Sequence, residues 1–137
     1  MDAVGRIMDW WRANSGRFVN LEEVLPHVVI HKVPDATDNA PQPLLLGAKS
    51  VQASIVGTAD PRFYHSRLNS DWRAFAQQVV GEHRRISDSG TPDLISGYFS
   101  PDGNDANGFN FERLALPIKT MDGARLLLSY TRRVTVH

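Results

Sequence analysis

Histidine is the residue type of this chain best suited to chemistry, because a neutral imidazole can bind a metal ion or move a proton near neutral pH. His83 falls on the apolar side of a helical pattern, where its imidazole could ligate iron or simply pack in the core. His27 and His31 lie four residues apart on a segment with strand character. At that spacing they share one face of a strand but stand roughly 13 Å apart, which is too far for one ion. We therefore expect no metal site.

A second group of polar residues lies in an irregular segment ahead of the longest predicted helix. His65, with Tyr64 and Arg67, could hold the polar end of a ligand or belong to a surface loop. Asp60, His65 and Ser66 do not form a recognisable nucleophilic site, because nothing in the sequence places a base against the hydroxyl and no strand-turn-helix elbow surrounds it. We expect no catalytic residues.

Arg113 is the remaining charged residue of interest, since it interrupts an apolar strand-like run. Its stem can pack along a sheet while its charge pairs with an acid such as Glu112 or Asp93. Alternatively, the charge lies inside a cavity or at an interface with a partner. The sequence leaves both interpretations open.

The composition fits one folded domain without a strong electrostatic preference. The chain has 137 residues, of which 42% are hydrophobic, and its 15 acidic and 15 basic residues cancel. Because there is no net positive field, we do not expect nucleic acid as a partner. Cysteine is absent, which excludes disulfides and thiolate metal sites and fits a cytoplasmic location. The N-terminus lacks a signal-peptide pattern, and no stretch has the roughly 18 to 20 apolar residues that span a bilayer, so we expect no membrane association.

An amphipathic helix is predicted over residues 2–13, ended by residues 14–16. Trp10 and Trp11 are adjacent and therefore about 100° apart around the helix, so one indole is expected to project away from the apolar stripe. The helix either caps its own domain or uses the extra apolar surface in a homodimer. The predicted dimer interface comprises Val4, Ile7, Met8, Trp10 and Trp11.

Two strands are predicted next, before a helical region. Residues 28–33 are rich in β-branched side chains and favour a first strand, and the proline-rich residues 34–43 favour a loop. Alternating apolar residues favour a second strand within residues 44–58. Residues 59–70 are expected to form short helical turns.

The longest helix is predicted from Trp72 to Ile86, because its apolar residues repeat on one face, and Gly90 ends it. Three strands joined by turns follow, within residues 94–100, 109–118 and 126–131. In the middle strand the phenylalanines and the leucines fall on opposite faces, so either a bulge interrupts it or both faces are buried. We favour burial of both faces.

These elements predict an α+β fold with a five-stranded antiparallel sheet and its helices gathered on one face. The strands carry more apolar surface than one crossover helix can cover. The N-terminal helix or a second subunit is therefore expected to cover the opposite face.

Five short segments carry a resemblance to a known family: Trp10-Trp11-Arg12 through Gly16-Arg17, Val24 to Ile30, Ile55 to Thr58, Ser89 to Pro92 and Phe111 to Ile118. With these segments in this order, the chain resembles a single-domain bacterial PAS protein that opens with a tryptophan-containing helix. The segment between Arg17 and Leu25 looks shorter than in similar sequences, and the loop at 34–43 looks longer.

The resemblance implies an N-terminal capping or dimerisation helix at residues 1–20 and a PAS-like domain at 21–137. It implies a sensory or regulatory module that acts through another protein, with a small metabolite held between sheet and helices, and it brings no catalytic motif. Heme-binding relatives often place an axial ligand where His83 stands, so heme is the one cofactor to test. The residues expected to line the cavity are Tyr64, His65, Trp72, Phe75, Val79, His83, Tyr98, Phe111, Arg113 and Leu128.

Two other functions are compatible with the sequence. One is an enzyme or small-molecule carrier on a cone-shaped α+β fold, and the other is an interaction module with a filled core. Element order argues against the first, because that fold groups its helices before the strands, whereas here the longest helix interrupts them.

Overall fold

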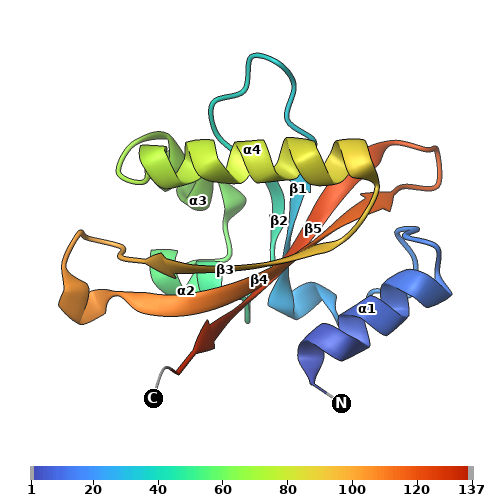
Figure 1. Cartoon of the computed structure of the whole chain (residues 1–137), viewed down its shortest axis with the longest axis horizontal. Coiled ribbons are helices and arrows are strands. Elements are labelled where there is room, and N and C mark those ends of the chain that lie inside the picture. Colours follow the sequence, from blue (N-terminus) through green and yellow to red (C-terminus); the bar gives the residue numbers. More distant parts are fainter. Residues whose placement is uncertain (1, 136–137) are drawn as a thin grey trace.

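The computed structural model describes residues 2–135 and has an α+β fold with four α-helices and five strands (Figure 1). Short 3-10 turns at Leu25–His27 and Asp105–Asn107 precede β1 and β4. The helices are α1 (Ala3–Ala13), α2 (Val51–Val56), α3 (Pro61–Asn69) and α4 (Arg73–Ser89). The strands are β1 (Val28–Lys32), β2 (Pro43–Leu46), β3 (Asp93–Phe99), β4 (Phe109–Lys119) and β5 (Arg125–Val134).

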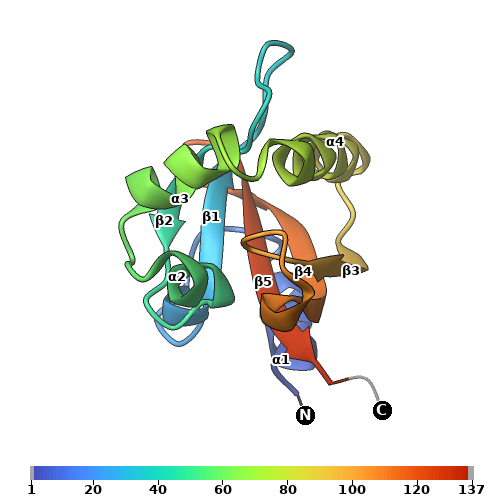
Figure 2. The same cartoon turned by 90° about the vertical axis from the view of Figure 1, so that its left-hand side faces the viewer.

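The strands form one antiparallel sheet in the order β2-β1-β5-β4-β3. After the β1–β2 hairpin the chain crosses one face of the sheet through α2, α3 and α4, and the last three strands then bring β5 back to the centre beside β1. Figure 2 shows α3 nearer to β2 and α4 nearer to β3. This architecture confirms the predicted PAS-like fold class, including the helical crossover between the second and third strands.

The two faces of the sheet have separate apolar cores. Side chains of α2, α3 and α4 pack against one face, in a cluster that includes Trp72 and Phe99. On the opposite face, α1 contributes Ile7 to a cluster with Leu116 and Leu128. The N-terminal helix therefore covers the second face, which is one of the two coverings expected from the sequence.

Most of residues 44–58, predicted as a second strand, do not form a strand. Strand β2 ends at Leu46, and residues 51–56 form α2. The Ser50 hydroxyl accepts a hydrogen bond from the Ala53 backbone N–H and so caps the start of this helix, while Gly57 ends it with φ +77°. The strand prediction was wrong here because alternation over so few residues does not distinguish a strand from a short helix.

The helical region that follows is more regular than expected. Residues 59–70, predicted as short turns, contain the single helix α3, which Asp60 caps at its start. Helix α4 confirms the predicted long helix and ends at Gly90, whose φ is +69°. Its buried residues are Ala76, Val79, Val80, His83, Ile86 and Ser87.

Strand β4 is buried on both faces and has no bulge. Its register with β3 and β5 is continuous, so the phenylalanine and leucine positions alternate without interruption. Phe111 and Arg113 point toward the crossover helices, and Leu114 and Leu116 belong to the core beneath α1. This confirms the prediction that both faces are buried.

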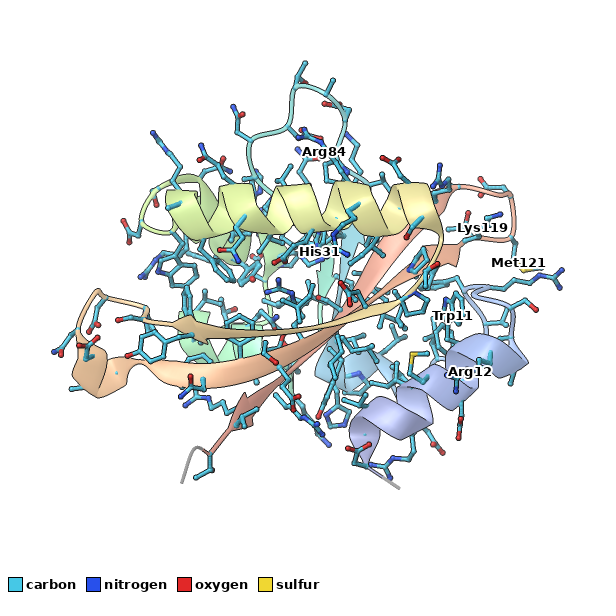
Figure 3. The ribbon with its side chains drawn as sticks, in the orientation of Figure 1. Trp11, Arg12, His31, Arg84, Lys119 and Met121 are labelled. Atoms are coloured by element: carbon cyan, nitrogen blue, oxygen red, sulfur yellow. The ribbon has the colours of Figure 1, made fainter. Side chains whose placement is uncertain are left out.

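The C-terminal end of α1 is joined to β4. The Trp11 indole N–H donates to the Pro117 carbonyl oxygen at 2.7 Å. The Phe18 backbone N–H donates to the Lys119 carbonyl oxygen, and the Lys119 backbone N–H donates to the Gly16 carbonyl oxygen. Strand β3 pairs with β4 only up to Ala115, so Pro117 lies on an open edge where a missing N–H costs no ladder hydrogen bond. Figure 3 shows Trp11 on the side of α1 that faces the sheet.

Candidate ligand cavity

A small aromatic cavity lies between the sheet and the crossover helices. Its volume is about 20 Å³, which is room for about one water molecule. Every element that meets at this point contributes to the wall, from α2, α3 and α4 to the three late strands. The lining residues are Val51, Gln52, Ile55, Tyr64, Trp72, Phe75, Phe99, Phe109, Phe111, Arg113 and Thr131.

Aromatic rings make most of this wall and hold one another edge to face. The Trp72 and Phe99 ring centroids lie 5.2 Å apart at 82°, and those of Phe75 and Phe111 lie 6.4 Å apart at 88°. The Trp72 indole N–H donates to the Pro101 carbonyl oxygen at 2.8 Å, which fixes that ring. The wall is therefore apolar and preorganised, except at three polar side chains.

Arg113 brings a charge into the cavity wall from β4. Its side chain is only 6% exposed and forms an ion pair with Glu82 of α4, whose side chain is 13% exposed. The guanidinium also lies over the Phe111 ring, with 5.4 Å from Cζ to the centroid. The partners expected from the sequence were wrong, because Glu112 pairs with Arg132 across the strands and Asp93 pairs with Arg85. Arg113 Nε has no hydrogen-bond partner.

Gln52 and Thr131 form the second polar feature of the cavity. The Gln52 side-chain Nε2 donates to Thr131 Oγ1 at 2.7 Å and ties α2 to β5. Gln52 is 7% exposed, and its Oε1 has no hydrogen-bond partner. Arg113 and Gln52 both line this cavity, and each has one buried polar atom without a hydrogen-bond partner.

Two histidines are buried next to this cavity without lining it. His31 of β1 and His83 of α4 are 3% and 1% exposed, and their ring centroids lie 4.8 Å apart. Burial lowers the pKa of His83 to about 3 and the pKa of His31 well below its usual value, with the Arg113 charge acting in the same direction. Both imidazoles are therefore neutral near pH 7. Figure 3 shows His31 beneath α4.

The environment of His83 does not fit heme as the chain is folded. Its imidazole packs against His31, and both of its ring nitrogens are buried without a hydrogen-bond partner. The neighbouring cavity of about 20 Å³ has no room for a porphyrin. Within residues 2–135, no group of three or more His, Asp or Glu side chains is arranged to hold a metal ion.

Five of the ten predicted cavity residues meet at the cavity: Tyr64, Trp72, Phe75, Phe111 and Arg113. Burial raises the pKa of Tyr64 to about 12, so its phenol stays neutral. Val79 and His83 lie on the buried side of α4 but do not line the cavity.

The other three predicted cavity residues lie elsewhere, which corrects the sequence-based assignment. Leu128 points to the opposite face of the sheet and packs in the core beneath α1. Tyr98 is 50% exposed, because its position on the edge strand β3 faces away from α4. His65 is half-buried, and its Nδ1 lies 3.2 Å from the Pro41 carbonyl oxygen.

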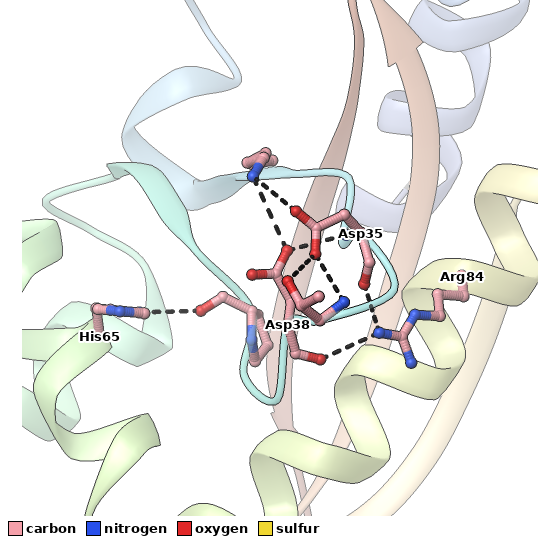
Figure 4. A network of polar contacts seen from close by, with 7 residues as sticks. Asp35, Asp38, His65 and Arg84 are labelled. Carbon is pink, nitrogen blue, oxygen red and sulfur yellow. Dashed lines mark hydrogen bonds and ion pairs between the residues drawn. The ribbon is translucent and has the colours of Figure 1, made fainter.

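His65 contributes to a separate polar network on the loop between β1 and β2 (Figure 4). Arg84 of α4 donates hydrogen bonds to the carbonyl oxygens of Asp35 and Asp38, at 2.6 and 3.1 Å. Lys32 lies within 4 Å of both aspartate carboxylates. The proline-rich loop is therefore attached to α4 on one side and, through His65, to α3 on the other.

The residues predicted for a dimer interface pack inside the same chain. Ile7 is 4% exposed, and the neighbouring side chains Val4, Met8, Trp10 and Trp11 are half-buried in the core beneath α1. Both indoles are engaged, since Trp10 donates to the Val19 carbonyl oxygen at 2.8 Å and Trp11 donates to Pro117. Dimerisation through what remains exposed on this helix stays a prediction.

No protein-family model matches the chain, and no curated protein matches its sequence. Among the described residues, no helix combines the length and apolar character that crossing a membrane requires.

Proposed function

We propose that this chain is a non-enzymatic PAS-type regulatory domain, which senses a small molecule in its aromatic cavity and acts through contact with another protein. The observation that supports the proposal most is the ion pair between Arg113 and Glu82. Arg113 lies in the cavity wall, whereas Glu82 belongs to α4, so the pair connects the interior of the sheet to the longest surface helix.

The proposed mechanism is a shift between two packings of α4 on the sheet. A ligand that contacts Arg113 alters the geometry of its ion pair with Glu82 and so changes which packing of α4 is favoured. The shift can only be as large as the difference in affinity of the ligand for the two packings. The solvent-exposed side of α4, with Arg85 and Asp88, then presents a different surface to a partner.

A homodimer is the proposed assembly, with α1 as the contact element and a signalling protein as a further partner. A bacterial origin is what the PAS resemblance implies, and a cytoplasmic location is what the absence of cysteine favours; both stay predictions. The predicted N-terminal segment 1–20 and PAS-like segment 21–137 include residue 1 and residues 136–137, which lie outside the described residues.

The small cavity volume favours a second candidate function, an interaction module with a filled core. In that case the interior only stabilises the fold, and regulation acts through surface contacts alone. The two candidates differ in whether a ligand enters the aromatic cavity.

Native mass spectrometry together with an absorption spectrum of the protein as purified tests the proposal. We expect a dimer mass that dissociates on dilution, and any copurified ligand appears as an added mass. A protein that remains monomeric over a wide concentration range, with no copurified protein or ligand in its mass spectrum, would contradict the proposal. Catalytic turnover by the purified protein would contradict the non-enzymatic part of the proposal.

A further inference from the structure

Two residues that line the cavity each carry a buried polar atom without a hydrogen-bond partner, and these atoms indicate what the cavity recognises. Gln52 Oε1 accepts hydrogen bonds and Arg113 Nε donates them, and neither has a partner although their residues are only 7% and 5% exposed. Burying such atoms without partners costs stability. A ligand group that both donates and accepts hydrogen bonds matches the chemistry of these two atoms.

The charge balance of the site favours a neutral group. The positive charge of Arg113 is already compensated by Glu82. A carboxylate ligand would bring a second negative charge and would also face the Gln52 carbonyl oxygen, whose orientation is set by the hydrogen bond from its Nε2 to Thr131. Hydroxyl and primary amide groups carry the required donor and acceptor without a charge.

The rest of the wall favours a flat apolar body. The rings of Trp72, Phe75 and Phe111 line the same cavity as Gln52 and Arg113. Aromatic side chains contact planar rings through offset or edge-to-face geometry, as they already do with one another here. A ring compound is therefore better matched to this wall than a flexible polar chain.

The present volume of about 20 Å³ accommodates the polar group but not a ring. The wall formed by α2 is the one most able to move, because this helix has only six residues and its cavity-lining Val51 and Ile55 are half-buried. Strands β4 and β5, by contrast, are paired along ten positions. Entry of a ring is therefore expected to displace α2 rather than the sheet.

We propose that the cavity binds a neutral ring compound bearing one hydroxyl or primary amide, with that group between Gln52 Oε1 and Arg113 Nε and the ring among the aromatic side chains. The inference rests on the proposed function, because it takes the cavity to be a ligand site. It adds the chemical class of the ligand and names α2 as the element that moves.

The three tryptophans provide a built-in readout for the test. Trp72 lines the cavity, whereas Trp10 and Trp11 lie on the opposite face of the sheet. Benzamide, benzoate and toluene are titrated into ¹⁵N-labelled protein while the three indole N–H signals are followed. We expect benzamide to shift the Trp72 signal saturably, leave the other two in place, and bind on the order of tenfold more tightly than benzoate or toluene.

A matched pair of variants then locates the polar group. Gln52→Met removes the amide with little change in volume, and it should weaken benzamide on the order of tenfold while leaving toluene unchanged. Gln77→Met makes the same substitution at an exposed position of α4 and should change neither. If Gln52→Met does not fold, the comparison of the three probes on the unaltered protein still decides the proposal.

Benzoate binding as tightly as benzamide would overturn the proposal, and so would the absence of a saturable Trp72 shift up to the solubility limit of benzamide. If the protein still dimerises, neither result contradicts the proposed regulatory function. Tight benzoate binding would favour an anionic ligand, and the absence of a Trp72 shift would favour a filled core. A monomeric protein that binds benzamide as expected would contradict the proposed dimer but keep this inference.

Discussion

His31 and His83 contact each other ring to ring in the interior, although they belong to β1 and α4 and are separated by more than fifty positions. Their centroids are 4.8 Å apart, and the charged group that faces them both is Arg113 of β4. Protonating either imidazole would place a charge in a buried site beside a second positive charge.

Stability should therefore fall as the pH falls. The folded-state pKa of each histidine lies below the unfolded value of about 6.5, so the unfolded chain binds more protons than the folded protein below that pH. The stabilisation is complete above pH 6.5 and is lost on acidification, by up to about 1.4 kcal/mol per pH unit for each histidine. Urea unfolding between pH 8 and pH 5 measures the slope.

Matched histidine variants test the assignment of that slope. His83→Phe should reduce it by about one proton, whereas His27→Gln changes an exposed histidine and should leave it unchanged. A slope that survives His83→Phe in full would mean that other groups carry the pH dependence.

Breaking the pair of Arg113 and Glu82 should be strongly and unequally destabilising. Glu82→Gln leaves a nearly buried guanidinium without its counter-charge and should cost about 3–5 kcal/mol of unfolding free energy. Arg113→Met should cost less, because the more exposed Glu82 carboxylate can rotate to water. The double variant should recover part of the loss. Strictly additive costs in the double variant would contradict a coupled pair, and equal costs for the two single variants would contradict the expected inequality.

Removing the Thr131 hydroxyl should release α2. In Thr131→Val the Gln52 Nε2 loses its partner, at a cost of about 1–3 kcal/mol, and hydrogen exchange over residues 51–57 should accelerate more than exchange in α4. Adding Gln52→Leu should restore part of the stability, since no buried amide is then left unpaired. Uniform acceleration along the whole chain would show that α2 has no independent opening.

Gly16→Ala should disturb the contact between α1 and β4. Gly16 has φ +70°, and an added Cβ would lie 3.0 Å from Trp11 Nε1 and 3.3 Å from the Pro117 carbonyl oxygen. We expect a loss of about 1–3 kcal/mol in unfolding free energy and a shifted Trp11 indole N–H signal.

Gly90→Ala is the matched control for that substitution. Gly90 has nearly the same backbone conformation, at φ +69°, but an added Cβ there would meet no atom within 4 Å. The difference in unfolding free energy between the two variants measures the effect of crowding at Trp11, because both variants share the cost of the left-handed conformation. If the two cost the same, the close approach of Trp11 does not matter for stability.

Long elements were predictable because their patterns repeat. The stripe that begins at Trp72 continues over four turns of α4, and the two-sided apolar pattern of β4 persists along the strand. Helix α2 was missed because it is short, and the signals that define it are its caps, Ser50 and Gly57, rather than its apolar residues.

The cavity was predictable only where a residue's face followed from its own element. Phe75 and Phe111 were found in this way, but Leu128 was placed on the wrong face because its direction depends on its register opposite Leu116 of β4. Gln52 was missed because its partner is 79 positions away. Glu82 gave no signal either, since a single acid on a helix is ordinarily solvated.

The backbone hydrogen bonds between Lys119 and residues 16–18 attach the C-terminal end of α1 to the sheet more firmly than its N-terminal end is attached. The C-terminal end is continuous with the sheet, whereas the N-terminal end is held by the half-exposed ion pair of Asp2 with Arg132. If the direction of α1 changes, its attached end near Gly16 is therefore the end that moves least. Movement of β4 would then swing the far end of α1 through the largest arc, and a small displacement inside the molecule would be enlarged at its surface.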